Sequence, residues 1–194
     1  MTEPATDPFA LFQDWMAKAT QTEINDPNAM TLATATADGR PSARIVLLKG
    51  ADREGFVFYT NTESRKGREL GANPGVALLF HWKSLGRQVR IEGLAEPVGT
   101  DEADEYFASR PRISRLGAWA SEQSRRLPDR ATLEARLHEM DTRYQAAVPR
   151  PPHWSGYRVR PESFEFWQDM PFRLHDRTVF QRTREGWEAV KLYP

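Results

Sequence analysis

The apolar residues near the start of the chain recur at helical spacing. Phe9, Phe12, Trp15 and Met16 fall at i, i+3 and i+4 positions, and such positions share one face of an α-helix. The segment 7–23 is therefore predicted to hold an amphipathic helix, and residues 1–8 are expected to form a tail before it.

From residue 30 the apolar period changes to two, which is the period of a β-strand. Residues 30–50 are predicted to form a hairpin, because Asp38-Gly39 is a strong signal for a tight turn. Strand candidates follow at 55–62, 76–82 and 87–98, and a short helix over 64–75 would have Ser64 as its N-cap. Residues 30–98 are thus predicted to form an antiparallel meander within a small barrel or sheet.

Beyond residue 100 the pattern becomes helical. A helix over 100–110 is expected to start at Thr100 as a capping residue, and a second helix is expected over 130–147. Between them lies a basic stretch, and a proline-rich connector at 148–154 leads to strand candidates at 156–168, 172–183 and 187–194. The predicted fold class is α+β, mainly β, with helices packed around one sheet system.

Length, charge and cysteine content narrow the possibilities. The 194 residues suit a single domain over 1–194. The 27 Lys and Arg balance 27 Asp and Glu, which argues against a protein that binds nucleic acid or membrane through bulk charge. The chain contains no cysteine, so thiolate metal sites are excluded. Since the N-terminal segment has no basic start and no long apolar run, we expect a cytoplasmic protein without a membrane span.

The first candidate site is a set of cations around the predicted strand 43–50. Arg44 and Lys49 flank this apolar strand, and Arg65 and Lys66 directly follow the N-cap Ser64. Helix N-termini offer free N–H groups and partial positive charge, so this set could hold a phosphate. The alternative is that the cations are ordinary solvated surface charges.

The strand period raises a question about Arg44 and Lys49. Alternation places Arg44, Val46 and Leu48 on one face and Ile45, Leu47 and Lys49 on the other. Either a bulge lies between the two cations, or they serve different parts of a cleft near the end of the strand.

A second cluster lies in the segment 172–177. Arg173, His175 and Arg177 stand at alternate positions, so a continuous strand would present them on one face. A neutral imidazole there could accept or relay a proton, and Trp167 could form a wall against a planar ligand. The alternatives are an exposed ladder of charges with Asp176 and Glu165 as counter-ions, and a tryptophan that is plain core.

Several common motifs are absent from the sequence. There is no glycine-rich dinucleotide fingerprint, no P-loop and no pair of histidines at metal-ligand spacing, so no metal site is predicted. Two groups of cations beside aromatic residues instead suggest a flat phosphorylated cofactor and a phosphorylated substrate.

Five segments together resemble the pyridoxamine 5′-phosphate oxidase family, in order and at the expected spacing. They are RIVLLKG (44–50), FYTNTESRKGREL (58–70), RQVRIEG (87–93), YFASRPRISRLGAWASEQS (106–124) and EFWQ…RLHDR…QR (165–182). The resemblance implies a homodimer of FMN-binding split β-barrels, with FMN in clefts at the subunit interface. It also implies oxidation of pyridoxamine or pyridoxine 5′-phosphate to pyridoxal 5′-phosphate, with O2 as electron acceptor and H2O2 as product.

The resemblance further implies which residues hold each ligand. The FMN set is Arg44, Ile45, Val46, Leu47, Leu48, Lys49, Tyr59, Thr60, Arg65, Lys66, Gln88, Gln123, Ser124, Trp167 and Arg177. The substrate set is Lys49, Tyr106, Arg110, Ser114, Arg173, Leu174 and His175. Arg173 and His175 are the implied catalytic residues, which would steer hydride and proton transfer.

Two other functions compete with this interpretation. A related split-barrel flavoprotein reductase would act on another substrate, and it would have no reason to carry the complete substrate set. A binding protein could store FMN or pyridoxal phosphate without turnover.

Overall fold

The structure is a computed structural model that describes residues 7–194. It begins with α1 (Pro8–Thr22), whose N-cap Asp7 accepts a hydrogen bond from the backbone N–H of Phe9. The predicted first helix is therefore confirmed. Of the predicted tail, Asp7 and Pro8 belong to the start of α1, and residues 1–6 lie outside the described residues.

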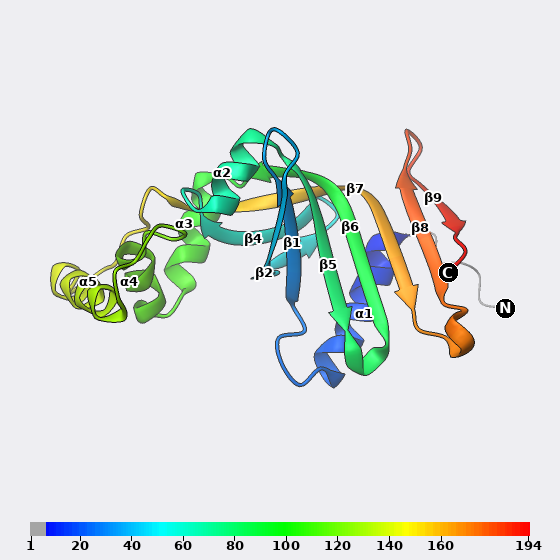
Figure 1. Ribbon diagram of the computed structural model, residues 1–194, viewed down its shortest axis with the longest axis horizontal. Coiled ribbons are helices and arrows are strands. Elements are labelled where there is room, and N and C mark those ends of the chain that lie inside the picture. The colour runs from blue at the N-terminus through cyan, green and yellow to red at the C-terminus, as the bar shows by residue number, and fades with distance from the viewer. Residues whose placement is uncertain (1–6) are drawn as a thin grey trace.

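The strands form one curled antiparallel sheet (Figure 1). They are β1 (Ala29–Ala35), β2 (Pro41–Leu47), β3 (Gly50–Asp52), β4 (Gly55–Asn61), β5 (Gly75–Trp82), β6 (Arg87–Pro97), β7 (Trp154–Gln168), β8 (Asp176–Arg182) and β9 (Trp187–Lys191). The order is β2-β1-β5-β6-β7-β4-β3, and β8 pairs with β7 and β9. The mainly β fold with peripheral helices agrees with the predicted fold class.

The sheet confirms the first hairpin but corrects the predicted meander. The turn between β1 and β2 closes where the N–H of Thr36 donates to Arg40 O, and Gly39 there has a φ of +83°. β4, however, pairs with β7 rather than with β5. β7 spans 15 residues, long enough to pair with β4 along its first part and with β8 along its last part, while β6 pairs with it over residues 157–168. This pairing joins segments far apart in sequence, so local periodicity could not reveal it.

The main core lies between α1 and the sheet. Phe12 on α1 packs with its ring centroid 4.9 Å from that of Phe56 and 5.1 Å from that of Phe80. Trp15 packs edge-on against Phe166 at 5.2 Å. The apolar face predicted for the first helix is therefore the face that covers the sheet.

Three helices form a second cluster at one end of the molecule, opposite the β8–β9 hairpin (Figure 1). They are α3 (Thr100–Ser109), α4 (Arg112–Ala120) and α5 (Arg130–Arg143), and they bury Phe107, Leu116 and Met140 against Trp154. Thr100 is the first helical residue and Gly99 the N-cap, so the predicted cap is off by one position. α4 was not predicted, because its arginines obscured its narrow apolar face.

The strand predicted over 172–183 starts later than expected. β8 begins at Asp176, whereas Phe172 and Arg173 in the 3-10 turn η2 (Pro171–Arg173) have φ values of +59° and +62°. A left-handed backbone cannot continue a strand, so Arg173, His175 and Arg177 do not share one strand face. No helix within residues 7–194 has the length and apolar character needed to cross a membrane.

Candidate active site

A cavity of about 680 Å³ lies between the sheet and the helical end of the molecule. β2 and β4 supply one wall, α3 and α4 the opposite wall, and Lys66 of α2 (Arg65–Ala72) closes one end. The predicted ligand-binding residues that line it are Ile45, Val46, Leu47, Lys49, Tyr59, Thr60, Lys66, Tyr106, Arg110, Ser114 and Gln123. Residues from the FMN set and from the substrate set thus face one space.

An aromatic stack forms part of the cavity wall. The rings of Tyr59 and Tyr106 are parallel within 10° with centroids 4.0 Å apart, and Trp154 stacks on the other side of Tyr59 at 5.3 Å. Burial and the negative charge of Glu102 raise the pKa of Tyr59 to about 12. The Tyr59 hydroxyl therefore stays protonated near neutral pH and can donate a hydrogen bond.

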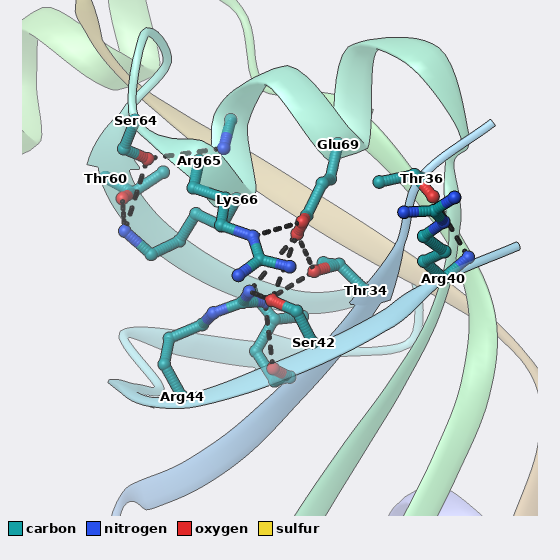
Figure 2. A network of polar contacts seen from close by, with 12 residues as sticks. Thr34, Thr36, Arg40, Ser42, Arg44, Thr60, Ser64, Arg65, Lys66 and Glu69 are labelled. Atoms are coloured by element: carbon teal, nitrogen blue, oxygen red, sulfur yellow. Dashed lines mark hydrogen bonds and ion pairs between the residues drawn. The ribbon is translucent and has the colours of Figure 1, made fainter. Parts of the chain in front are cut away.

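Lys66 brings a positive charge into the cavity without a carboxylate partner among the described residues. Its Nζ donates to Thr60 Oγ1 at 3.0 Å, Ser64 Oγ at 3.3 Å and Gln123 Oε1 at 2.6 Å. All three acceptors are neutral, as Figure 2 shows for Thr60 and Ser64. Burial, followed by the nearby charge of Arg44, lowers the pKa of Lys66 to about 8.

Arg110 also lines the cavity and has no carboxylate partner among residues 7–194. Its guanidinium lies 4.8 Å from the Trp154 ring centroid and 5.5 Å from that of Phe107. Its Nη1 is buried with no hydrogen-bond partner among residues 7–194. Burial also lowers the pKa of Arg110 from its ordinary value. Buried donors are nearly always satisfied, so this group suits an anionic ligand.

Arg44 and Lys49 serve different places, which answers the question raised by the strand period. The pairing of β1 with β2 runs without a bulge from Ala29↔Leu47 to Ala35↔Pro41. β2 ends at Leu47, and the N–H of Lys49 donates to Val57 O on β4. Lys49 lies beyond the end of β2 and lines the cavity, whereas Arg44 contacts Glu69 of α2 and does not line it.

Arg44 enters a buried network under α2 that Figure 2 shows. Its Nη1 donates to Leu32 O at 3.2 Å and Thr34 Oγ1 at 2.5 Å, and its Nη2 donates to Ser42 Oγ and to Glu69 Oε2. Arg65 contacts the same carboxylate, with Nε 2.8 Å from Glu69 Oε1. Although burial opposes it, hydrogen bonds from Thr34 and Arg65 lower the pKa of Glu69 to about 2.

The C-terminal part of the predicted site forms a separate group. Gln88 pairs with Trp167 across the β6–β7 ladder, and Trp167 pairs with Arg177 across β7–β8. The His175 ring lies 4.6 Å from the Trp167 ring, with its Nδ1 3.0 Å from Asp169 Oδ1. The buried Glu165 accepts from Arg177 Nε at 2.7 Å, so Glu165 is the counter-ion that the sequence suggested.

The chain thus brings most of the predicted residues to two places, the cavity and a second group. The second group is Gln88, Trp167, Arg173, Leu174, His175 and Arg177, where β6, β7, η2 and β8 meet. Arg44 and Arg65 belong to the network under α2 and do not line the cavity. Figure 1 shows η2, in orange, at the end of the molecule opposite α4. Leu48 is buried in the core instead, and Ser124, with a φ of +70°, lies in a smaller cavity of about 250 Å³ beside Gln123.

Two residues of this region were missed by the sequence analysis. Glu69 connects Arg44 to Arg65, and Trp154 supports both the aromatic stack and Arg110. Glu69 had a detectable signal, because it follows Arg65 by four residues on a predicted helix, the spacing of an ion pair. Trp154 had none, since it is the last residue of the proline-rich connector.

Comparison with known proteins identifies the class of fold and then the family. The solved structure of PhzG from Burkholderia lata 383, in complex with tetrahydrophenazine-1-carboxylic acid, superposes with a TM-score of 0.94 at 36% identity, covering 99% of this chain and 95% of that one. A pyridoxamine 5′-phosphate oxidase-related, FMN binding protein from Nostoc punctiforme shares the fold, with a TM-score of 0.77 at 14% identity. The fold is therefore that of the split β-barrel proteins.

The sequence matches place the chain within one family of that class. Residues 16–144 match the pyridoxamine 5′-phosphate oxidase family, and residues 154–194 match the pyridoxine 5′-phosphate oxidase C-terminal dimerisation region. The pyridoxine/pyridoxamine 5′-phosphate oxidase of Gluconobacter oxydans is 65% identical over 189 residues, covering 97% of this chain and 94% of that protein. That of Granulibacter bethesdensis is 64% identical over 194 residues. The chain belongs to the pyridoxamine 5′-phosphate oxidase family.

Proposed function

We propose that the protein is an FMN-dependent oxidase that converts pyridoxamine 5′-phosphate and pyridoxine 5′-phosphate to pyridoxal 5′-phosphate. The observation that carries this proposal is the single cavity that gathers residues of both predicted ligand sets. Family membership and the names of the relatives at 65% and 64% identity support it.

The residues around the cavity fit FMN. The volume of the cavity lies in the range of ordinary cofactor sites. Lys66 and the Arg44–Glu69–Arg65 network combine three cations with one carboxylate, and the two surplus charges match a phosphate monoester of about −1.5 to −2. Lys66, Arg65 and the N–H groups at the start of α2 would hold that phosphate.

The other end of the cavity fits a phosphorylated substrate. Arg110 offers an unpartnered buried N–H, and Lys49, Tyr106 and Ser114 line the same space. Together they would bind the substrate phosphate and orient its pyridine ring. Bound FMN would supply the acceptor for hydride removal from the substrate C4′ carbon, and O2 would then take the electrons and yield H2O2.

A homodimer would complete the site. Trp167, Arg173, His175 and Arg177 belong to the second group and do not line the cavity of their own chain, and residues 154–194 match the family's dimerisation region. In the proposed dimer each cavity receives this group from the partner subunit. Arg173 and His175 would then lie over the substrate ring, where they orient it and move a proton.

An oxygen-electrode assay of the FMN-loaded protein tests the proposal. With pyridoxamine or pyridoxine 5′-phosphate, we expect oxygen uptake matched by pyridoxal 5′-phosphate formation and by H2O2. A protein that binds FMN and consumes no oxygen would instead be a binding protein. Oxygen uptake only with unrelated reduced substrates would indicate a flavoprotein of different specificity.

A further inference from the structure

We infer that Glu69 is a positioning residue for the cofactor phosphate: its buried carboxylate fixes the guanidinium groups of Arg65 and Arg44 beside the start of α2. This role deepens the proposed function and rests on it, because it requires the phosphate of FMN to bind there. Glu69 belongs to neither predicted ligand set, and its side chain is only 5% exposed.

Within residues 7–194, Arg65 is contacted at Nε and its terminal nitrogens make no hydrogen bond. Glu69 Oε1 accepts from Nε at 2.8 Å, which is the inner edge of the guanidinium. The two terminal nitrogens carry four more N–H donors, and the side chain is 59% exposed. An arginine that is already held at Nε has lost much of its rotamer freedom. Less of that freedom therefore remains to be lost when the arginine binds an anion.

Arg44 is held by the same carboxylate and by three further acceptors. Its terminal nitrogens contact Glu69, Thr34, Ser42 and Leu32 O, so its charge is fixed in place while few donors remain for a ligand. Thr34 connects Glu69 with Arg44, since its hydroxyl donates to Glu69 Oε2 at 2.5 Å and accepts from Arg44 Nη1 (Figure 2). The charge of Arg44 also reaches the neighbouring Lys66.

Positioning and bulk charge make opposite predictions for a loss of Glu69. Removing a carboxylate adds one unit of positive charge, so charge alone would tighten the binding of a phosphate. Loss of the Glu69 carboxylate would instead leave Arg65 mobile and leave one N–H group of Arg44 without an acceptor. Both changes weaken the binding of a phosphate. The sign of the change therefore separates the two explanations.

The experiment compares FMN with riboflavin, which lacks the phosphate, on the full-length apoprotein by quenching of flavin fluorescence. The readout is phosphate selectivity, the ratio of the riboflavin Kd to the FMN Kd. We expect Glu69→Ala to lower this ratio roughly tenfold, the effect of one charge-assisted contact. Glu69→Gln, whose amide oxygen can still accept from Arg65 Nε, should recover most of it.

Glu63→Gln is the matched control. Glu63 precedes α2 and pairs with Arg125 at 3.4 Å rather than with Arg44 or Arg65, so the same charge change should leave the ratio equal or higher. Thr34→Val, a nearly isosteric change, covers the case in which Glu69→Ala does not fold, and it should lower the ratio several-fold.

The outcomes distinguish this inference from the proposed function. A wild-type protein that binds FMN and riboflavin equally would contradict the phosphate site itself. A selective wild type whose Glu69→Ala and Thr34→Val variants keep the full ratio would overturn only the role of Glu69. A Glu69→Gln variant as weak as Glu69→Ala would also overturn it, because the accepting oxygen would then be irrelevant.

Discussion

Lys66 carries the charge in the cavity that is most sensitive to pH. Its pKa of about 8 reflects burial and the nearby Arg44. A bound phosphate raises this pKa, because an opposite charge favours the ammonium form. As pH rises through 8 the unliganded protein loses the Lys66 proton, and FMN binding must then take one up. We therefore expect the FMN affinity to be maximal below pH 8 and to decrease above it, by at most about tenfold per pH unit.

Titrations of FMN between pH 7 and 9.5 measure this effect, since the phosphate is already a dianion in that range. Lys66→Arg keeps its charge throughout and should bind FMN with a much flatter pH profile. Riboflavin provides the second control, because it has no phosphate for Lys66 to bind. An FMN Kd that stays constant up to pH 9.5 would contradict a direct role for Lys66.

His175 and Arg173 are expected to affect turnover more than cofactor binding to the cavity. Either residue changed to Ala should lower kcat/KM for pyridoxamine 5′-phosphate by roughly 10²–10⁴-fold, the usual effect of losing an acid–base group. Arg184→Ala, at an exposed position in the β8–β9 turn, should leave the rate unchanged. A His175→Ala variant with the wild-type rate would remove His175 from the proposed chemistry.

Single residues also show what sequence could and could not provide. Alternation predicted that Arg44 and Lys49 would lie apart, and they do, although Lys49 lies beyond the end of β2. It could not show that Arg44 faces a carboxylate, since Glu69 comes from a helix packed across the strands. The ring of Trp154 beneath Arg110 depends on tertiary packing in the same way.

At the scale of elements, the first turn of α2 positions the proposed phosphate site. Ser64 Oγ accepts from the N–H of Gly67 at 3.2 Å and from Lys66 Nζ, and it donates to Asn61 O. Ser64→Ala removes all three contacts. We expect it to lower the free energy of unfolding by about 1 kcal/mol, and to weaken FMN binding as well.

Asp129 provides the comparison, because it caps α5 by accepting from the N–H of Thr132 at 2.7 Å. Asp129→Ala removes a cap of the same kind from a helix outside the cavity lining, so denaturant melts should shift while the FMN Kd stays constant. Equal effects of both variants on FMN would show that stability alone, rather than the geometry of α2, controls binding.

The elements that sequence predicted well are those with strong local signals. α1, α2 and the β1–β2 hairpin each have a cap, a turn or a clear period. η2 was missed because two successive non-glycine residues, Phe172 and Arg173, adopt positive φ, which their residue types disfavour. The β4–β7 pairing was missed because long-range contacts leave no local trace.

At the scale of the whole molecule, one chain carries two groups of predicted ligand-binding residues that it does not bring together. The residues that line the cavity come partly from α3 and α4. These helices lie at the end of the molecule opposite η2 (Figure 1). In the proposed dimer, each complete site combines the cavity of one subunit with the η2 group of its partner. Hybrid dimers, in which the two subunits carry different substitutions, therefore provide a direct test. The twofold symmetry of the dimer determines which of the two sites contains each substituted residue.

One chain would carry Lys66→Ala, and the other Arg173→Ala with His175→Ala, each with its own affinity tag. In purified hybrids one site contains both defects and the other contains none, so activity should return to about half of the wild-type value per dimer. A hybrid of Lys66→Ala with Arg110→Ala is the matched control, because both defects lie in cavity groups and neither site is spared. If each chain instead built its site from its own two groups, the first hybrid would be as inactive as this control.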